Sequence, residues 1–363
     1  MISQPVKYPG LRGPRVFFLC EKLFQTLMAV YYEVLAFLFI KLTRYSHSFQ
    51  GNFQCNFQGL YTMQILITGG TGFIGRRLVA KLLSKGHRMT VLSRQDAKEV
   101  RRLLTSEVKP VKSLSAVNPS IAYDAVINLA GEGVMDERWT PSRKRQLLES
   151  RVTLTSELVD LIERMENRPR CLISGSAIGF YGGRDDATRL DESSDPGDDF
   201  AAGLCVRWEQ AAKRAEGLDV KVCLVRTSVV LHPEGGAMHE MLPPFRLGIG
   251  GPLGSGKQMM SWIHMDDMVN ALLFLLEKES VQGIFNATAP KAVSNKEYSK
   301  ALAASLNRPA FLTMPAMILK LLLGESSEMV LKGQNVYPER LLAEGFQFTY
   351  PQLQPALTQL IDA

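Results

Sequence analysis

A short apolar run that ends in three spaced glycines constrains this chain more than any other stretch. Residues 65–67 favour a buried strand, Gly69, Gly72 and Gly75 follow at G-x-x-G-x-x-G spacing, and a helical apolar pattern begins directly afterwards. Gly69 permits a tight turn, Gly72 lets a pyrophosphate approach closely, and Gly75 lets the helix pack on the strand. The phosphates would then meet free N–H groups at the helix N-terminus. The stretch therefore predicts a dinucleotide site.

The end of the second strand predicts which dinucleotide binds. Residues 89–93 form a β-favouring run about twenty residues beyond the glycines, and the run leads into Arg94. A site for NAD would present Asp or Glu here to hold the ribose 2′-hydroxyl. Ser93 and Arg94 instead offer a hydroxyl and a guanidinium, which suit a 2′-phosphate. We expect NADP, with an ordinary exposed arginine as the alternative interpretation of Arg94.

Later strands extend the alternating β-α pattern. Residues 125–129 read as a buried strand that enters a small-residue turn, where Ala130 and Gly131 let backbone groups line the cleft. A short third strand is expected near residues 108–111. One long helix is expected at residues 141–165, and on it Arg151 either reaches the cofactor phosphates or is a solvated helix arginine.

Composition limits the class of protein. The 363 residues include 42 Lys and Arg against 36 Asp and Glu, and the resulting charge of +6 is spread along the chain. Binding of nucleic acid would need a basic stripe, which the sequence lacks. The five cysteines form no C-x-x-C pair, which favours reduced thiols and argues against a zinc site or any other metal centre. We expect a reducing compartment, cytoplasmic or organellar.

The first 62 residues differ from the rest. They hold an apolar run, residues 27–40, that Glu33 interrupts and that is short for a membrane span. Lys7, Arg12 and Arg15 precede the run, so a targeting segment or an anchor is one interpretation. A poorly ordered extension is the preferred one, because Met63 opens the first strand directly. No firm membrane association is expected.

Several motifs occur in an order that resembles one known family. They are residues 68–75, 128–132, 138–139, 174–182, 226–231, 250–256 and 261–267. Together they resemble the extended short-chain dehydrogenases/reductases, the nucleotide-sugar epimerase superfamily, and within it the atypical epimerase-like family 39U. The resemblance covers about residues 63–360. It implies an α/β fold: a Rossmann-type, doubly wound parallel sheet with a smaller C-terminal, substrate-side α/β subdomain.

The resemblance also divides the chain and places its cofactor. It implies an NADP-binding Rossmann domain at residues 63–235 and a substrate-side region at 236–363, which ends in a family-specific module, residues 315–363. With the motifs above, it predicts these cofactor-binding residues: Gly69, Thr71, Gly72, Phe73, Ile74, Gly75, Ser93, Arg94, Leu129, Ala130, Gly131, Arg151 and Val230.

Local patterns in the second half predict further elements. A helix is expected at residues 206–215, and another at 268–277 with Asp266 or Asp267 as its N-cap. Ser294 and Glu297 form a capping box before the next helix. An apolar helix is expected at residues 315–331, too short and too interrupted by charge to cross a membrane.

One departure from the superfamily bears directly on catalysis. Its chemistry uses Ser together with Tyr-x-x-x-Lys, in which the lysine lowers the pKa of the tyrosine. None of the ten tyrosines here has Lys four residues later, and residues 199–205 stand where the pair would be. The candidate catalytic residues are therefore Ser176, Tyr181 and His264. Without its lysine, a tyrosine should keep a pKa near ~10.

Two functions follow from this departure. The first is an NADP-dependent oxidoreductase or epimerase-like enzyme that acts on a small or nucleotide-linked carbonyl substrate. The second is an NADP(H)-binding sensor or scaffold that has lost Tyr-x-x-x-Lys catalysis. Either would take a small molecule rather than nucleic acid as its partner, and a homodimer is left open.

Overall fold

A computed structural model describes residues 62–362, which belong to one structural unit, Leu60–Ala363. The expectations for the N-terminal extension fall outside the described residues. Within residues 62–362, no helix has both the length and the apolar character needed to cross a membrane.

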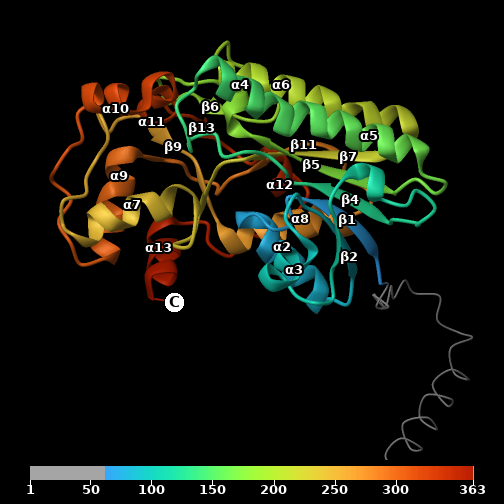
Figure 1. The fold of residues 1–363 in the computed structure, drawn as a ribbon. Coiled ribbons are helices and arrows are strands. Elements are labelled where there is room, and N and C mark those ends of the chain that lie inside the picture. The colour runs from blue at the N-terminus through green and yellow to red at the C-terminus, as the bar shows by residue number, and fades with distance from the viewer. Residues whose placement is uncertain (1–61, 363) are drawn as a thin grey trace, which may run out of the picture. The chain divides into compact units, whose positions relative to one another are not determined.

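A seven-stranded parallel sheet organises the unit (Figure 1). Its order is β11 (Gly283–Ala287), β7 (Lys221–Thr227), β5 (Cys171–Ala177), β4 (Ala125–Asn128), β1 (Gln64–Thr68), β2 (Arg88–Leu92) and β3 (Lys109–Val111). The chain starts in the interior of the sheet and winds outward in both directions from it. The predicted Rossmann-type, doubly wound fold is confirmed, and the third strand lies where the sequence predicts it.

Helices cover both faces of the sheet. On one face lie α4 (Pro141–Leu148), α5 (Leu154–Arg164) and α6 (Phe200–Lys213), and on the other α2 (Phe73–Ser84), α3 (Ala97–Leu103) and α8 (Met265–Glu277). Successive residues of a strand point to opposite faces. Ile65 and Ile67 of β1 therefore pack with α2 and α8, and Leu66 packs with α5 and α6. This double burial explains why β1 reads as an unbroken apolar run.

The predicted helix over residues 141–165 contains an irregular turn. A π-helical turn, η3 (Glu149–Thr153), joins α4 to α5 without a break in the chain direction. Such turns inside helices are common at functional sites, because the wider turn re-aims the side chains on it. Here it carries Ser150 and Arg151 toward the carboxyl end of the sheet.

The substrate-side region holds the smaller elements. It contains the paired strands β8 (Val229–Leu231) and β10 (Trp262–His264), β9 (Met259–Met260) and β12 (Val293–Ser294), and β6 (Arg189–Leu190) and β13 (Asn335–Val336). Its helices are α7 (Gly236–Arg246), α9 (Asn295–Ser305), α10 (Ala316–Leu323), α11 (Glu328–Leu331), α12 (Glu339–Ala343) and α13 (Leu353–Asp362). A core around Trp262, Tyr298 and Leu357 holds α7, α9 and α13 together.

The chain passes between the two regions more than once. It builds β6 and β8 before residue 235 and α7, β9 and β10 after it, then returns to the main sheet through α8 and β11 before it forms β12 and β13. The division at residue 235 therefore stays a prediction, and a single cut in the chain does not separate the two sets of elements.

Helix ends differ from expectation at three places. Helix α6 begins at Phe200 rather than at residue 206, because the Asp199 side chain caps it by accepting from the Ala202 N–H. The N-cap of α8 is His264, not Asp266 or Asp267. The predicted helix at 315–331 stops at Gly324, whose φ is 64°, and continues as a 3₁₀ turn and α11. The capping box of Ser294 and Glu297 is confirmed.

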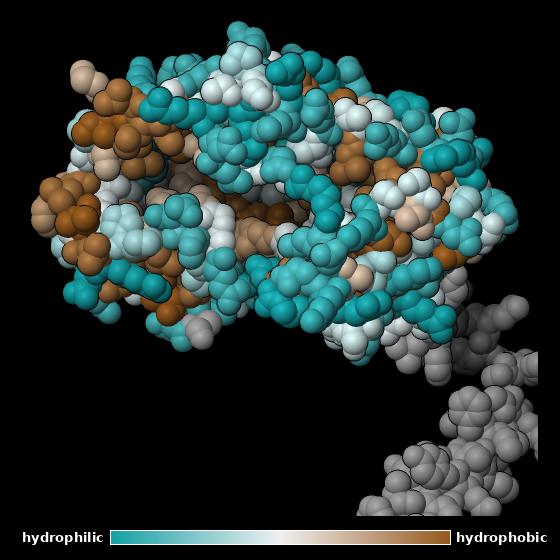
Figure 2. Space-filling model, viewed as in Figure 1, coloured by the Kyte–Doolittle hydropathy of each residue, from teal (hydrophilic) through white to brown (hydrophobic). Residues whose placement is uncertain are grey.

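Apolar side chains are exposed mainly at the substrate-side end (Figure 2). Those on α10 and on the segments before α10 and after α7 are Leu247, Ile249, Phe311, Leu312, Met314, Met317, Ile318, Leu321 and Leu322. The nucleotide-binding end, by contrast, presents a mostly hydrophilic surface in the same view.

Candidate cofactor and active site

The glycine turn after β1 has the close contacts that its sequence predicts. Gly69 has a φ of 70°, and a Cβ there would lie 2.5 Å from the Leu129 carbonyl carbon and oxygen. A Cβ on Gly75 would lie 2.1 Å from the Gly69 carbonyl oxygen. Gly72, the N-cap of α2, donates its N–H to the Gly69 carbonyl at 3.0 Å. The turn is thus closed by backbone contacts that leave no room for side chains.

The start of α2 is suited to an anion. Its first turn carries no acidic residue and no side chain caps it, so the partial positive charge of its N-terminus is not neutralised from within the helix. Thr71 and Gly72 line a cavity that opens directly beside this turn.

That cavity follows the carboxyl ends of four strands. Its volume is about 810 Å³, and it is lined by the glycine turn, residues 92–95 after β2, 112–114 after β3 and 129–132 after β4. The side of the α4–α5 helix closes it. In open α/β sheets, ligands bind outside the carboxyl ends of the strands. Of the predicted cofactor residues, Gly69, Thr71, Gly72, Ser93, Arg94, Leu129, Ala130 and Gly131 line this cavity.

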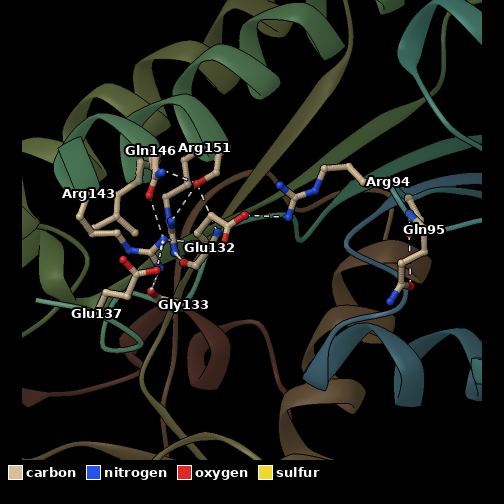
Figure 3. Close-up of polar contacts among 11 residues, drawn as sticks. Arg94, Gln95, Glu132, Gly133, Glu137, Arg143, Gln146 and Arg151 are labelled. Atoms are coloured by element: carbon tan, nitrogen blue, oxygen red, sulfur yellow. Dashed lines mark hydrogen bonds and ion pairs between the residues drawn. The ribbon is translucent and has the colours of Figure 1, made fainter.

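Two cations stand at the β2 and β3 edge of the cavity. Arg94 is 89% exposed in its side chain and donates to Glu132 at 2.7 Å (Figure 3). Lys112, which follows β3, forms an ion pair with Asp96. The Ser93 hydroxyl accepts from the Gln95 N–H at 3.2 Å and shapes the turn after β2. Both cations can reach a phosphate on the adenosine side of the cavity.

Arg143 is a further cation in the cavity wall that the sequence did not single out. It lies on α4 and is only 5% exposed. Its guanidinium donates to the Gly133 carbonyl at 2.8 Å and to Gln146 at 3.2 Å, while its Nε has no hydrogen-bond partner. The predicted helix over residues 141–165 carries several arginines. Only the fold shows which of their side chains turns inward, so the sequence did not distinguish Arg143 from the others.

Arg151 lies at the inner end of the cleft. Its guanidinium donates to the Glu132 carbonyl oxygen at 2.7 Å and stacks over Trp208 at 5.3 Å. Desolvation by burial lowers the pKa of Arg151. A Cβ on Gly131 would lie 2.9 Å from its Cζ, so the arginine abuts the turn after β4. Its predicted contact with the cofactor stays a prediction.

Besides Gly75 and Arg151, three other predicted residues lie outside the cavity lining. Phe73 packs its ring against His232 and the backbone of Gly235. Val230 is buried in β8 beside Ile263 of β10. Ile74 packs against the core shared by α2 and α8. Their roles toward a cofactor stay predictions.

Ser176 belongs to a buried polar network at the end of β5. Its hydroxyl donates to Glu209 on α6 at 2.7 Å. Both Glu209 oxygens in turn accept from Arg226, at 2.8 and 3.0 Å. All three side chains are at most 4% exposed. A bidentate pair of this kind has fixed geometry, so it holds the Ser176 side chain in one orientation.

Tyr181 lies at the far end of the same network. Its hydroxyl donates to Asn286 of β11 at 2.7 Å and accepts from Arg226 at 3.0 Å. Desolvation by burial raises the pKa of Tyr181 to about 12, despite the opposing effect of Arg226. A phenol that is 1% exposed and paired on both sides is poorly placed to exchange a proton with a ligand in the cleft.

His264 serves as a structural cap in this arrangement. Its Nδ1 accepts from the Asp266 N–H at 3.1 Å, its Nε2 lies 2.9 Å from the Gln359 amide oxygen, and its ring stacks on Tyr350. Desolvation by burial lowers its pKa. The imidazole thus joins β10, α8 and α13, and its predicted role as proton donor stays a prediction.

The described cysteines are free and buried. They are Cys171, Cys205 and Cys223, and burial raises the pKa of the Cys205 thiol to about 12. A thiol of this kind is a weak nucleophile, so Cys205 is a core residue rather than a candidate nucleophile. Residues 62–362 contain no group of three potential metal ligands.

The geometry of the cleft agrees with what known proteins show. The model of the NAD dependent epimerase/dehydratase family matches residues 65–288. The chain belongs to this family. A second match, to a domain of unknown function named DUF1731, covers residues 314–360. This second match corresponds to the C-terminal module that the sequence resemblance implied.

Relatives within the family are similar over most of the chain. The chloroplastic SDR39U1 homolog of Arabidopsis thaliana is 39% identical over 318 residues, covering 85% of this chain and 89% of the relative. SDR39U1 of Mus musculus is 38% identical and covers 82% of this chain and all of the relative. A crystal structure of human SDR39U1 with NADPH superposes with a TM-score of 0.76 at 36% identity, covering 83% of this chain and 99% of that one.

Proposed function

We propose that this protein binds NADPH along the carboxyl ends of β1, β2 and β4 and transfers its hydride to the carbonyl group of a small or nucleotide-linked substrate. The observation that carries the proposal is the glycine turn together with Arg94 and Lys112 in one cavity. The crystal structure of the human relative, which was determined with NADPH, supports the same cofactor.

The residues present fit the cofactor. A Cβ at Gly69 or Gly75 would collide with backbone, and the turn thereby leaves the α2 N-terminus open to a pyrophosphate. The turn after β2 ends in Arg94 rather than in an acid, so its charge suits a 2′-phosphate. The small residues Ala130 and Gly131 leave space beside the turn after β4.

The chain's own groups would supply binding and orientation. Bound NADPH would provide the hydride, and water would supply the proton that the substrate oxygen then takes up. Ser176, at the end of β5, is the residue that we place beside the substrate oxygen, and it would donate to that oxygen by turning its hydroxyl hydrogen away from Glu209. We assign Tyr181 and His264 no proton transfer, because both are enclosed by protein partners. The proposal includes a small-molecule substrate. It also places the protein in a reducing compartment, cytoplasmic or organellar.

A second candidate is an NADPH-binding sensor or scaffold. The specific observation in its favour is that Tyr181 has a raised pKa and no access to the cleft, while the lysine of the superfamily's pair is missing from the sequence. Such a protein would bind NADPH with the same contacts and turn over no substrate.

The cofactor part of the proposal is tested by Arg94→Ala. A charge-assisted contact to phosphate is worth ~1.5–3 kcal/mol. Because Arg94 is exposed, we expect its contact to contribute a free energy at the low end of this range. We therefore expect the variant to bind NADPH about tenfold more weakly and NADH with little change, measured by calorimetric titration. The exposed Arg101→Ala is the matched control. Equal affinity of the unmutated protein for both nucleotides would contradict the assignment.

The catalytic part is tested by single-turnover oxidation of NADPH against a panel of carbonyl compounds and nucleotide sugars. With an accepted substrate, Ser176→Ala should slow the oxidation of NADPH strongly. Tyr181→Phe and His264→Ala should keep both its rate and its pH dependence, once the rate is corrected for the fraction of each variant that is folded. An inflection near ~6.5 that disappears in His264→Ala would restore the histidine as donor. Tight binding of NADPH without turnover on any compound would favour the sensor.

A further inference from the structure

Glu132 lies between two arginines in the cofactor cavity. Its Oε1 accepts from Arg94 at 2.7 Å, and its Oε2 lies 3.9 Å from Arg143 (Figure 3). The two arginines come from opposite walls: Arg94 follows β2, and Arg143 belongs to α4. The carboxylate of Glu132 thus spans the cavity and lies on the arginine that the 2′-phosphate of NADPH would need.

The main chain of Glu132 is held by two hydrogen bonds to one helical turn. Its N–H donates to the Ser150 hydroxyl at 3.2 Å and its carbonyl accepts from Arg151 at 2.7 Å. Both partners belong to the π-helical turn η3, which therefore anchors this position of the chain. The side chain is 28% exposed and ends in the ion pair with Arg94. Rotation about its side-chain bonds moves the carboxylate without moving the backbone.

The opposite wall can receive the carboxylate. The guanidinium of Arg143 is buried, and its Nε has no hydrogen-bond partner. Of the two acids near it, Glu137 lies 3.5 Å away but is 66% exposed in its side chain, whereas the side chain of Glu132 is 28% exposed. A buried arginine with an unused donor favours a nearby carboxylate more than an exposed arginine does.

We propose that Glu132 is the internal counter-ion of the cofactor site and determines its specificity: it occupies Arg94 until a 2′-phosphate replaces it, and then pairs with Arg143. The proposal deepens the proposed function and rests on the binding of NADPH. NADH carries a 2′-hydroxyl and no second charge at this position, so it leaves the pair of Arg94 and Glu132 in place. Glu132 thereby lowers the affinity for NADPH while leaving that for NADH almost unchanged.

The first test is Glu132→Gln, titrated with NADPH and with NADH by calorimetry. An exposed ion pair is worth at most about 1 kcal/mol, which corresponds to about a fivefold change in affinity. We expect NADPH to bind about threefold to fivefold more tightly and NADH to change by less than about twofold. The control is Glu137→Gln, which removes the same charge near Arg143 without touching Arg94, and its effect on NADPH affinity should be smaller than that of Glu132→Gln. A thermal unfolding scan of each variant verifies that the fold is retained.

The decisive test repeats the substitution without the arginine. In an Arg94→Ala background, Glu132→Gln should lose its effect on NADPH affinity, because the counter-ion has no arginine to occupy. An unchanged effect in that background, or an equal effect of Glu137→Gln, would show general electrostatics and overturn the proposal. Weaker NADH binding in Glu132→Gln would instead make Glu132 an acceptor for the ribose 2′-hydroxyl and also overturn it. Failure of the unmutated protein to bind NADPH would overturn the proposed function and this role with it, whereas the outcomes above overturn this role alone.

Discussion

The two ends of the cleft are built in different ways. At the glycine turn, the geometry is made by backbone: a Cβ on Gly69 or Gly75 would collide with backbone atoms, and Gly72 donates its N–H to the Gly69 carbonyl. At the end of β5, the geometry is made by side chains, since Ser176, Glu209, Arg226 and Tyr181 hold one another through hydrogen bonds. The first end is suited to phosphates, and the second holds side chains of four separate elements in place.

Because of this difference, the two ends tolerate different substitutions. A backbone turn tolerates almost any change in the side chains around it, but no added carbon at its glycines. The buried network tolerates small changes in volume but no removal of a charge, because each remaining group would be left without its partner. Substitutions at the two ends should therefore fail for opposite reasons.

The largest effect is expected at Glu209. Glu209→Ala leaves Arg226 buried with no carboxylate, and breaking a buried pair in this way costs about 3–5 kcal/mol. We expect that loss in the free energy of unfolding, measured by urea titration, together with a displaced Ser176. The exposed Glu216→Ala, a few residues farther along the same segment, should change stability by less than about 0.5 kcal/mol. If Glu209→Ala lowered the free energy of unfolding by less than about 1 kcal/mol, the buried network would not be what stabilises the end of β5.

A smaller effect is expected at the glycine turn. In Gly75→Ala the added methyl group would lie 2.1 Å from the Gly69 carbonyl oxygen and 2.8 Å from the Gly70 Cα, so α2 must shift away from the turn. Overpacking of this kind costs about 1–3 kcal/mol, and NADPH affinity should fall more than tenfold. Gly217→Ala is the matched control, because nothing lies within 4 Å of its added carbon. Unaltered NADPH affinity in Gly75→Ala would contradict the claim that the glycine turn tolerates no added carbon.

The smallest effect, and the one most dependent on pH, is expected at Tyr181. Tyr181→Phe leaves Asn286 and Arg226 each without one partner and should cost about 1–2 kcal/mol at pH 8. Burial raises the pKa of Tyr181 to about 12, whereas an unfolded tyrosine titrates near ~10. The folded chain therefore keeps a proton that the unfolded chain releases, and the stability from Tyr181 is complete below pH ~10 and lost by pH ~12.

The measurement is the free energy of unfolding of both proteins across that range. The difference between the unmutated protein and Tyr181→Phe should narrow above pH 10, by at most about 1.4 kcal/mol per pH unit, and should disappear by about pH 12. A constant difference would mean that Tyr181 is not enclosed as described. An accessible phenol would also become a candidate proton donor again.

The sequence predicts the glycine turn better than the network at the end of β5, because the turn is made by local backbone and the network by side chains far apart in the sequence. Glycine spacing, strand and helix are local patterns, so the turn and the charge of Arg94 could be anticipated from a dozen residues. Glu209 and Asn286 are separated from Ser176 and Tyr181 by 33 and 105 residues, and no local pattern shows that they meet. Arg143 and Glu132 were missed likewise, because their roles depend on how α4 faces the turn after β2.

The errors at helix ends have a similar origin. Asp266 and Asp267 match the ordinary preference for acids at an N-cap, yet His264 caps α8. The carboxylate of Asp267 instead accepts from the N–H groups of Thr349 and Tyr350, at 2.8 and 2.9 Å. A partner more than eighty residues away in the C-terminal segment thus overrides a local propensity.

The return of the chain to the sheet has a consequence for the order of assembly. β11 pairs with β7 along Cys223–Thr227, and Arg340 of α12 donates to the carbonyl groups of Ile284 and Gln282 beside it. Synthesis proceeds from the N-terminus, so the ribosome must have made almost the whole chain before this edge of the sheet is paired and covered. Until then β7 presents an open edge, which is the part of a sheet most prone to pairing with other chains. A nascent chain halted near residue 235 would therefore hold the glycine turn and most of the sheet, yet depend on chaperones to stay unassociated.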